Sequence, residues 1–469
     1  MISNIIDSYI NLDLFSSPYY KIKMRILLLI YMAMLSVVVA SSPNIVLIIS
    51  DDQAWTDYGF MGHPDIKTPH IDKLASESVL FKRGYVPTAL CRPSLATLLT
   101  GQYASTHKIT GNDPSPKYAE RNSKLYNERR AKIISFIDDF DTLPELLSKK
   151  NYLSHQSGKY WEGNHKRAGF THGMTRGFPQ PGGRHGDDGL KIGRTGMKPI
   201  KDFIDIAKRE KKPYFLWYAP FLPHTPHNPP QRLLKKYNKD GRSIHIAKYY
   251  AMCEWFDESC GDLLRIIDGN GDRENTLVIY VTDNGWIQNP NRGGYDARSK
   301  QTPYEGGIRT PIMFRWPSKM KSEERNELVS SIDIVPTILA ASGARTPESL
   351  PGINLLPNLE NRNTIKRDTI FGESFAHDIA DLNKPEASLL FRWAIKDKWK
   401  LLLTYDGEVN RYKSTHPRNE KRPQLFDLNL DPHEKINLAK DNPKKVAELA
   451  NAIHSWYPLK ERKTITIFE

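Results

Sequence analysis

One cysteine, Cys91, opens a segment whose residues predict a helix. Pro93 suits a first helical turn, because its missing N–H would lack a partner there, and Gly101 supplies a stop. Ala96 and Leu98 between them are good helix formers. A thiol at a helix N-terminus lies beside free N–H groups and the positive end of the helix dipole, which favour an anion. Position 91 can therefore hold a reactive thiol, although a lone cysteine before a helix can also be a buried structural residue.

Four oxygen-bearing side chains follow two apolar runs. Asp51 and Asp52 come directly after the first run, and Asp283 and Asn284 come directly after the second. Such runs predict buried parallel strands, and α/β sheets bind ligands at the carboxyl ends of these strands. Oxygen ligands suit Ca²⁺ or Mg²⁺, and no His/Cys cluster has zinc spacing. The pattern predicts a divalent-cation site, although two adjacent acids can also form a solvated turn.

The elements that must position these residues alternate along the chain. Apolar runs predict strands at 44–50, 152–157, 213–219, 276–282 and 311–316, and helices are predicted at 69–76, 244–267 and 333–341. From about residue 360 the pattern changes to consecutive antiparallel strands at 391–393, 394–396 and 400–405, followed by a helix at about 442–456. We therefore predict an α/β fold: a large mixed, mostly parallel sheet sandwiched by helices (residues 43–359), with a smaller C-terminal α+β subdomain (360–469).

The N-terminal residues 1–42 have the pattern of a secretory signal peptide behind an extension. A basic stretch at 21–25 precedes an apolar run at 26–40, and small residues follow. The run is shorter than the about 20 residues that span a bilayer. We expect translation to begin at Met24, no stable membrane insertion, and a secreted or periplasmic protein. An uncleaved membrane anchor is the alternative.

Charge and cysteine content narrow the class of protein. The 469-residue chain has a formal net charge of +13, which favours anionic partners. Its basic residues are scattered without interleaved aromatic residues, so we predict no nucleic-acid binding. Three cysteines argue against a disulfide framework. Cys253 and Cys260 fall in one predicted helix, about 10 Å apart, which is too far for a disulfide.

The segment 91–101 resembles the modification motif of the sulfatase family, Cys-x-Pro-Ser-Arg followed by Thr-Gly. The matching residues are Cys91, Pro93, Ser94, Thr100 and Gly101. The resemblance implies that a formylglycine-generating enzyme oxidises Cys91 to formylglycine, whose hydrate is the nucleophile. Leu95 departs from the motif, because most sulfatases have an arginine there that contacts the formylglycine.

Three further stretches resemble the family's active-site motifs. Lys159, in Gly-Lys-Tyr-Trp, corresponds to the lysine that binds the sulfate. His224, in Pro-His-Thr-Pro, corresponds to a histidine that contacts the sulfate or the leaving group, and His227 lies beside it. Lys300 corresponds to a lysine that touches the ester oxygen or the nucleophile. The resemblance thus implies that Lys159, His224 and Lys300 are catalytic and bind substrate.

The resemblance also assigns the predicted cation site. Asp51, Asp52, Asp283 and Asn284 match the family's cation ligands, with the modified Cys91 as a further ligand. The cation is usually Ca²⁺, and Mg²⁺ is the other candidate. Two later stretches also resemble the family, so the resemblance spans about residues 44–439; they are Ser331–Leu339 and Leu425–Leu438. It implies the alkaline-phosphatase-like fold and hydrolysis of sulfate esters.

A second departure lies at Trp161, where most sulfatases have a histidine. We hypothesise that Arg92, as a substrate-binding residue, or a basic group of the 162–194 loop such as His165 compensates for the two lost residues. Loops 105–135 and 162–196 are expected to line the entrance, and their basic residues suit an anionic sugar.

Two alternatives to a sulfatase acting on a sulfated small molecule or polysaccharide remain. One keeps the fold and hydrolyses phosphonate or phosphate esters. The other binds sulfated polysaccharide without catalysis, which the net charge of +13 and the two departures favour.

Overall fold

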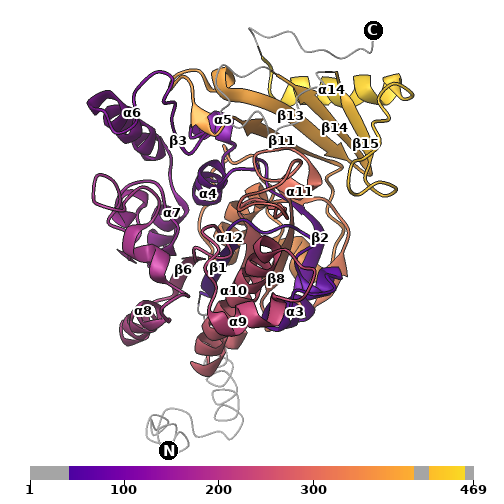
Figure 1. The fold of residues 1–469 in the computed structure, drawn as a ribbon. Coiled ribbons are helices and arrows are strands. Elements are labelled where there is room, and N and C mark those ends of the chain that lie inside the picture. Colours follow the sequence, from indigo (N-terminus) through magenta and orange to yellow (C-terminus); the bar gives the residue numbers. More distant parts are fainter. Residues whose placement is uncertain (1–41, 406–421, 460–469) are drawn as a thin grey trace, which may run out of the picture. The chain divides into compact units, whose positions relative to one another are not determined.

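A nine-stranded mixed sheet forms the centre of the computed structural model, which describes residues 42–405 and 422–459 (Figure 1). The strands lie in the order β10-β2-β8-β7-β1-β6-β4-β5, and β9 pairs with β2. Strands β7, β1, β6, β4 and β5 are parallel, whereas β8 is antiparallel to β7 and β2. Their bounds are β1 Asn44–Ser50, β2 Val79–Tyr85, β4 Leu153–Gly158, β5 His172–Gly173, β6 Tyr214–Ala219, β7 Thr276–Thr282, β8 Arg309–Arg315, β9 Glu323–Arg325 and β10 Val329–Ser330.

Helices cover both faces of this sheet, because its central strand is apolar on both sides. Ile45, Leu47 and Ile49 of β1 pack on one face, and Val46 and Ile48 pack on the other. The first face is covered by α4 Cys91–Thr100, α7 Leu143–Ser148 and α12 Ile334–Ala341, and the second by α3 Pro69–Ser76, α8 Lys198–Arg209 and α10 Ile244–Gly269. This arrangement confirms the predicted helix–sheet–helix sandwich.

The C-terminal region forms a separate antiparallel sheet in the order β11-β13-β14-β15, as predicted. Its elements are β11 Thr369–Phe375, β13 Leu389–Lys396, β14 Trp399–Thr404, β15 Gln424–Asp427 and the last described helix, α14 Pro443–Trp456. Residues 391–396, which we divided between two strands, form the single strand β13, because no turn residue interrupts this run. Buried Lys400 of β14 pairs with Glu305, 3.0 Å away, and so ties this sheet to the loop after Lys300. The domain boundary at residue 359 stays a prediction.

Shorter elements lie between these strands and helices. They are α5 Ala104–His107, β3 Asp113–Pro114, α6 Lys124–Ser135, α9 Gln231–Tyr237, α11 Glu305–Ile308, α13 Leu356–Asn361 and β12 Asp378–Ile379. Strand β3 pairs with β12, so the segment that precedes α6 touches the C-terminal region. Cys253 and Cys260 are both free and buried in α10, in agreement with the predicted absence of a disulfide.

The signal peptide, the start at Met24 and export concern residues 1–41, which lie outside the described ones, so all three stay predictions. Within the described ranges, no helix has both the length and the apolar content that a bilayer crossing requires.

Candidate active site

Six of the predicted site residues follow the carboxyl ends of four adjacent strands, β7, β1, β6 and β4, whereas Cys91 and Arg92 begin α4 and Lys300 lies in the loop before α11. The six are Asp51, Asp52, Lys159, His224, Asp283 and Asn284. The N–H of Asp283, after β7, donates to Ser50 O of β1 at 2.9 Å, and the N–H of Lys159, after β4, donates to Ala219 O of β6 at 2.7 Å. Gly158 permits this last approach, because a Cβ there would lie 1.9 Å from the Ala219 oxygen. Sheet register thus brings residues far apart in sequence to one edge.

The turn after β1 presents two carboxylates to the site. Asp52 has a left-handed backbone (φ 66°), and its N–H donates to Asp283 Oδ1 at 3.1 Å. The Asn284 amide donates to Asp52 Oδ1 at 2.7 Å. A non-glycine residue in this conformation is strained by about 1–2 kcal/mol, so the surrounding contacts must hold it. The result is a buried group of three carboxylates and one amide.

Two buried lysines face these carboxylates. Lys159 Nζ lies 2.6 Å from Asp51 Oδ1, and Lys300 Nζ lies 2.6 and 2.8 Å from the two oxygens of Asp52. Burial by itself would lower the pKa of both lysines, but the facing carboxylates outweigh it and raise the pKa of each above its ordinary value. Both ammonium groups are therefore charged in the site.

The thiol of Cys91 lies within this charged group. Its Sγ is 3.0 Å from Lys300 Nζ, 3.8 Å from Asp52 Oδ1 and 4.0 Å from Asp51 Oδ1. We expected the helix N-terminus to favour the anion, but burial dominates and raises the pKa of Cys91 to about 12. The unmodified thiol is thus un-ionised near neutral pH and is a weak nucleophile.

His224 reaches the same carboxylates from the loop after β6. Its Nε2 lies 3.3 Å from Asp52 Oδ2, and its Nδ1 lies 2.5 Å from the carbonyl oxygen of Thr225. Burial, with the charges of Lys159 and Lys300, holds the pKa of His224 well below its usual range. The imidazole is therefore neutral, and the carbonyl assigns the ring proton to Nδ1, which leaves Nε2 as an acceptor.

The donor set fits a divalent cation. Ligand atoms of Asp51, Asp52, Cys91 and His224 all lie within 4.8 Å of one another. Three buried oxygens of the predicted ligand residues lack a hydrogen-bond partner, namely Asp51 Oδ2, Asp283 Oδ2 and Asn284 Oδ1. Burial and mutual repulsion also raise the pKa of Asp51 and of Asp283. Clustered, unpaired oxygens of this kind are the ligands that Ca²⁺ and Mg²⁺ prefer.

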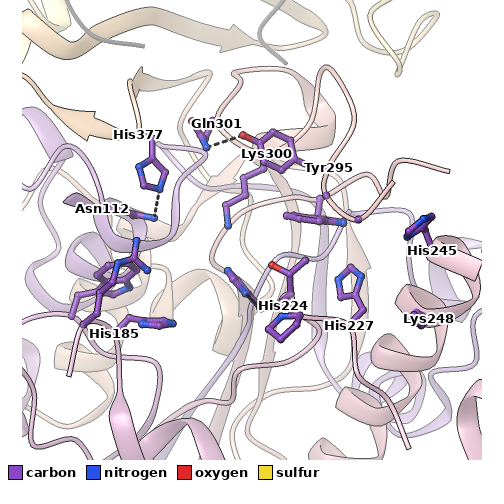
Figure 2. A pocket seen from close by; sticks show the side chains of 17 residues that line it. Asn112, His185, His224, His227, His245, Lys248, Tyr295, Lys300, Gln301 and His377 are labelled. Atoms are coloured by element: carbon purple, nitrogen blue, oxygen red, sulfur yellow. Dashed lines mark hydrogen bonds between the residues drawn. The ribbon is translucent and has the colours of Figure 1, made fainter. Parts of the chain in front are cut away.

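A cavity of about 540 Å³ opens above this group (Figure 2). Lys300 and His224 lie near its centre in the view, with Asn112, His185 and His377 to one side and His227, His245 and Lys248 to the other. Of the described residues that line it, none carries a carboxylate. The cavity is therefore suited to an anionic ligand.

The structure places neither Arg92 nor His165 at this cavity. The Arg92 guanidinium forms a two-point ion pair with buried Glu162, with Nε–Oε1 at 2.9 Å and a second N–O contact of 2.7 Å. His165 Nδ1 lies 3.0 Å from the carbonyl oxygen of Thr175. The two side chains that we expected to compensate for Leu95 and Trp161 are thus engaged elsewhere.

Sequence reasoning identified position 161 but did not single out Arg184, His185 or His377, which also line the cavity. Trp161 lies on its wall, with the Arg184 guanidinium 4.6 Å and the His185 ring 5.3 Å from the centre of its ring. The Gly-, His- and Arg-rich composition of 162–196 indicated a loop near the site but not which residues face it. His377 comes from the C-terminal region, and no sequence signal indicated it.

His377 also begins a chain of contacts that ends at the helix bearing Cys91. Asp378 Oδ1 lies 2.7 Å from His377 Nδ1, and the Asn112 amide lies 3.3 Å from His377 Nε2. Asn112 Oδ1 accepts the N–H of Arg92 at 3.1 Å, in the first turn of α4. The C-terminal region therefore helps to fix the N-terminus of α4.

Comparisons with known proteins agree with this geometry. The family model Sulfatase matches residues 43–344, and the model N-sulphoglucosamine sulphohydrolase, C-terminal, matches residues 292–457. The chain is 28% identical over 443 residues to the N-acetylgalactosamine-6-sulfatase of Homo sapiens, with 85% of this chain and 81% of that protein covered. The crystal structure of Ps i-CgsB superposes with a TM-score of 0.67 at 25% identity, covering 89% of this chain and 93% of that one.

A further structure shares the fold alone. The phosphonate monoester hydrolase of Agrobacterium radiobacter superposes with a TM-score of 0.62 at 19% identity, covering 91% of this chain and all (100%) of that one.

The Sulfatase model matches more than half of the chain. The chain therefore belongs to the sulfatase family and is a sulfuric ester hydrolase.

Proposed function

We propose that this protein hydrolyses sulfate esters of an anionic carbohydrate, with a formylglycine made from Cys91 as the nucleophile and Ca²⁺ or Mg²⁺ as the cofactor. Asp51, Asp52, Asp283 and Asn284 would hold the cation. The observation that carries the proposal is the position of Cys91 Sγ, which lies 3.0 Å from Nζ of the cavity-lining Lys300 and within 4.0 Å of a carboxylate oxygen from Asp51 and from Asp52.

The bound cation would polarise a sulfate oxygen and favour an ionised nucleophile. The charged ammonium groups of Lys159 and Lys300 stabilise negative charge that develops on the sulfate oxygens. The protonation states also separate two roles: Lys300 carries a proton that it can donate to the leaving oxygen, whereas the neutral His224 can only accept one at Nε2.

The sulfated carbohydrate is favoured by the lining of the cavity. Cationic side chains supply affinity for sulfate, and the half-buried Tyr295 supplies a flat apolar face against which a sugar ring can pack. The human relative at 28% identity acts on an N-acetylgalactosamine 6-sulfate group, as its name states, which makes sulfated amino sugars the first substrates to test. We further propose that the protein is secreted or periplasmic, on the residue pattern of 21–42.

The test is to express the protein with and without a formylglycine-generating enzyme. Peptide mass spectrometry measures the converted fraction of Cys91, and turnover of an aryl sulfate is measured in parallel. We expect turnover to rise in proportion to conversion, and the Cys91→Ala variant to be inactive. Equal turnover without conversion would contradict the proposal, and full conversion without turnover would favour the non-catalytic binder.

The phosphoester alternative needs its own measurement. The same converted protein is given an aryl sulfate and the matching aryl phosphonate, and kcat/KM is compared. We expect the sulfate to be preferred, and a preference for the phosphonate would replace the proposed substrate class while leaving the nucleophile in place.

A further inference from the structure

Three lysine or arginine side chains line the cavity, and they differ in whether a carboxylate is paired with them. Lys300 is paired with Asp52, and Arg184 is bound to Asp113 through contacts of 2.6 and 3.2 Å. Lys248 has no ion pair with any carboxylate of the described residues. The described lining contains no acidic side chain. Of the three cavity-lining Lys and Arg residues, Lys248 is therefore the one without a carboxylate facing it.

Lys248 lies on the helix α10, one turn after His245, and both side chains line the same end of the cavity (Figure 2). His227 stands between this end and the cation site. Burial lowers the pKa of His227 to about 4. The charge of Asp52 raises this pKa and the charge of Lys248 lowers it, so the His227 ring lies close enough to both residues to feel their charges. The end formed by Lys248 and His245 is thus part of the reaction cavity.

An aromatic wall joins the two ends. The Trp286 ring lies 5.7 Å from Lys300 Nζ on one side and 5.8 Å from the His227 ring on the other. Tyr295 packs edge-on against Trp286 at 5.2 Å, and its hydroxyl accepts from the Gln301 amide at 2.8 Å. Trp286 is buried, so the half-buried Tyr295 offers the ring face on which a sugar can pack. A sugar ring at Tyr295, with one sulfate at Lys300, would extend its other substituents toward Lys248.

We propose that Lys248, together with His245, binds a second anionic group of the substrate, a carboxylate or a second sulfate on the leaving sugar. This subsite rests on the proposed function and narrows its substrate class to carbohydrates that carry at least two negative charges. A partly buried lysine without a carboxylate partner supplies charge for a ligand, whereas the carboxylates bound to Arg184 and Lys300 already offset the charge of those residues.

The test measures binding separately from turnover. Isothermal titration calorimetry on the Cys91→Ala protein, which cannot form formylglycine, gives Kd for three probes. The probes are a hexosamine monosulfate, the matching hexosamine disulfate, and a disaccharide that carries one sulfate and one uronate carboxylate. The second and third probes distinguish sulfate from carboxylate as the second anion.

We expect the dianionic probes to bind at least about tenfold more tightly than the monosulfate, since a hydrogen bond to a charged group is worth at least this factor. Lys248→Gln removes most of this advantage, and Lys248→Arg, which keeps the charge, retains it. Lys235→Gln is the matched control, because Lys235 is an exposed lysine of the adjacent helix α9 that does not line the cavity.

Two results would overturn the subsite: no preference of the parent protein for a dianionic probe, or equal loss of the preference in the Lys248→Gln and Lys235→Gln proteins. Turnover of a monoanionic aryl sulfate by converted Cys91 protein is recorded separately. Absent turnover with an intact dianion preference refutes the proposed catalysis but leaves the subsite standing, so the two failures are distinguishable.

Discussion

The buried ion pair between Arg92 and Glu162 offers a direct test of whether Arg92 serves the fold or the substrate. The side chains are only 1% and 2% exposed, and the guanidinium makes two contacts of 2.7 and 2.9 Å with the carboxylate. Arg92 also donates to the carbonyl oxygen of Asn112 at 3.3 Å. Glu162→Gln removes the negative charge and leaves the guanidinium buried without a counter-ion.

Breaking such a pair from one side costs about 3–5 kcal/mol, because the remaining charge is uncompensated. That loss is a large share of the about 5–15 kcal/mol that stabilises a typical protein. The double variant Arg92→Met/Glu162→Leu removes both charges, and we expect it to recover most of the loss. Urea denaturation followed by tryptophan fluorescence measures the free energy of unfolding for each protein.

An exposed pair supplies the control. Lys198 and Asp202 of α8 are 83% and 56% exposed and lie 2.6 Å apart, and Asp202→Asn should cost no more than about 0.5 kcal/mol. The reasoning is refuted if Glu162→Gln costs as little as Asp202→Asn. It is also refuted if Arg92→Met keeps full stability but weakens sulfate-ester binding, which is the outcome that a substrate-binding Arg92 predicts.

Three further predictions concern the cation, the sulfate and pH. Asp283→Ala removes a cation ligand and should weaken Ca²⁺ binding at least about tenfold by calorimetry; unchanged affinity would exclude Asp283 as a ligand. Lys300→Met in fully converted protein should lower kcat by about 10²–10³-fold, because a charge that faces the reacting oxygens is lost, and a near-normal kcat would remove Lys300 from the mechanism. Burial raises the pKa of Glu373 from its ordinary value of 4.5 to about 7, so the folded protein keeps a proton that the unfolded chain has lost, and stability falls as pH rises from about 4.5 to about 7, by up to about 3 kcal/mol. The Glu373→Gln protein lacks this ionisation, so its free energy of unfolding should fall less between pH 5 and pH 8, and parallel pH profiles of the two proteins would contradict the buried acid.

The parts of the fold that could be predicted are those in which apolar residues repeat regularly within one segment. The strand at 44–50 and the helix at 91–100 are set by apolar runs and by turn residues that lie within the segment itself. The alignment of Asp51 with Asp283 followed from a general property of parallel sheets, whose carboxyl ends share one edge. Strand β2 (79–85) was missed because Lys82 and Arg83 interrupt its apolar pattern.

The parts of the site that could not be predicted depend on contacts between distant segments. Glu162 lies 70 residues after Arg92 in the chain, and nothing in either segment marks the other as its partner. His377 reaches the cavity from the C-terminal region through its contact with Asn112, 265 residues earlier. Loop sequences have no regular repeat of apolar residues that shows which side chains face inward, so the loop residues that line the cavity can be identified only from the structure.

The two departures from the family motifs, Leu95 and Trp161, show the same difference between what one segment reveals and what depends on contacts in the folded chain. Leu95 is 3% exposed and packs in the core beneath α4, so a cation at this position would have to be buried among apolar side chains. The exchange at Trp161 has a different consequence, because its ring packs against Arg184 and His185 of the same loop. Those contacts bring a guanidinium and an imidazole to the cavity wall, although neither belongs to a recognisable motif. Arg184 and His185 of the cavity wall therefore come from the 162–196 loop rather than from α4, and motif positions alone omit the positive charge of Arg184.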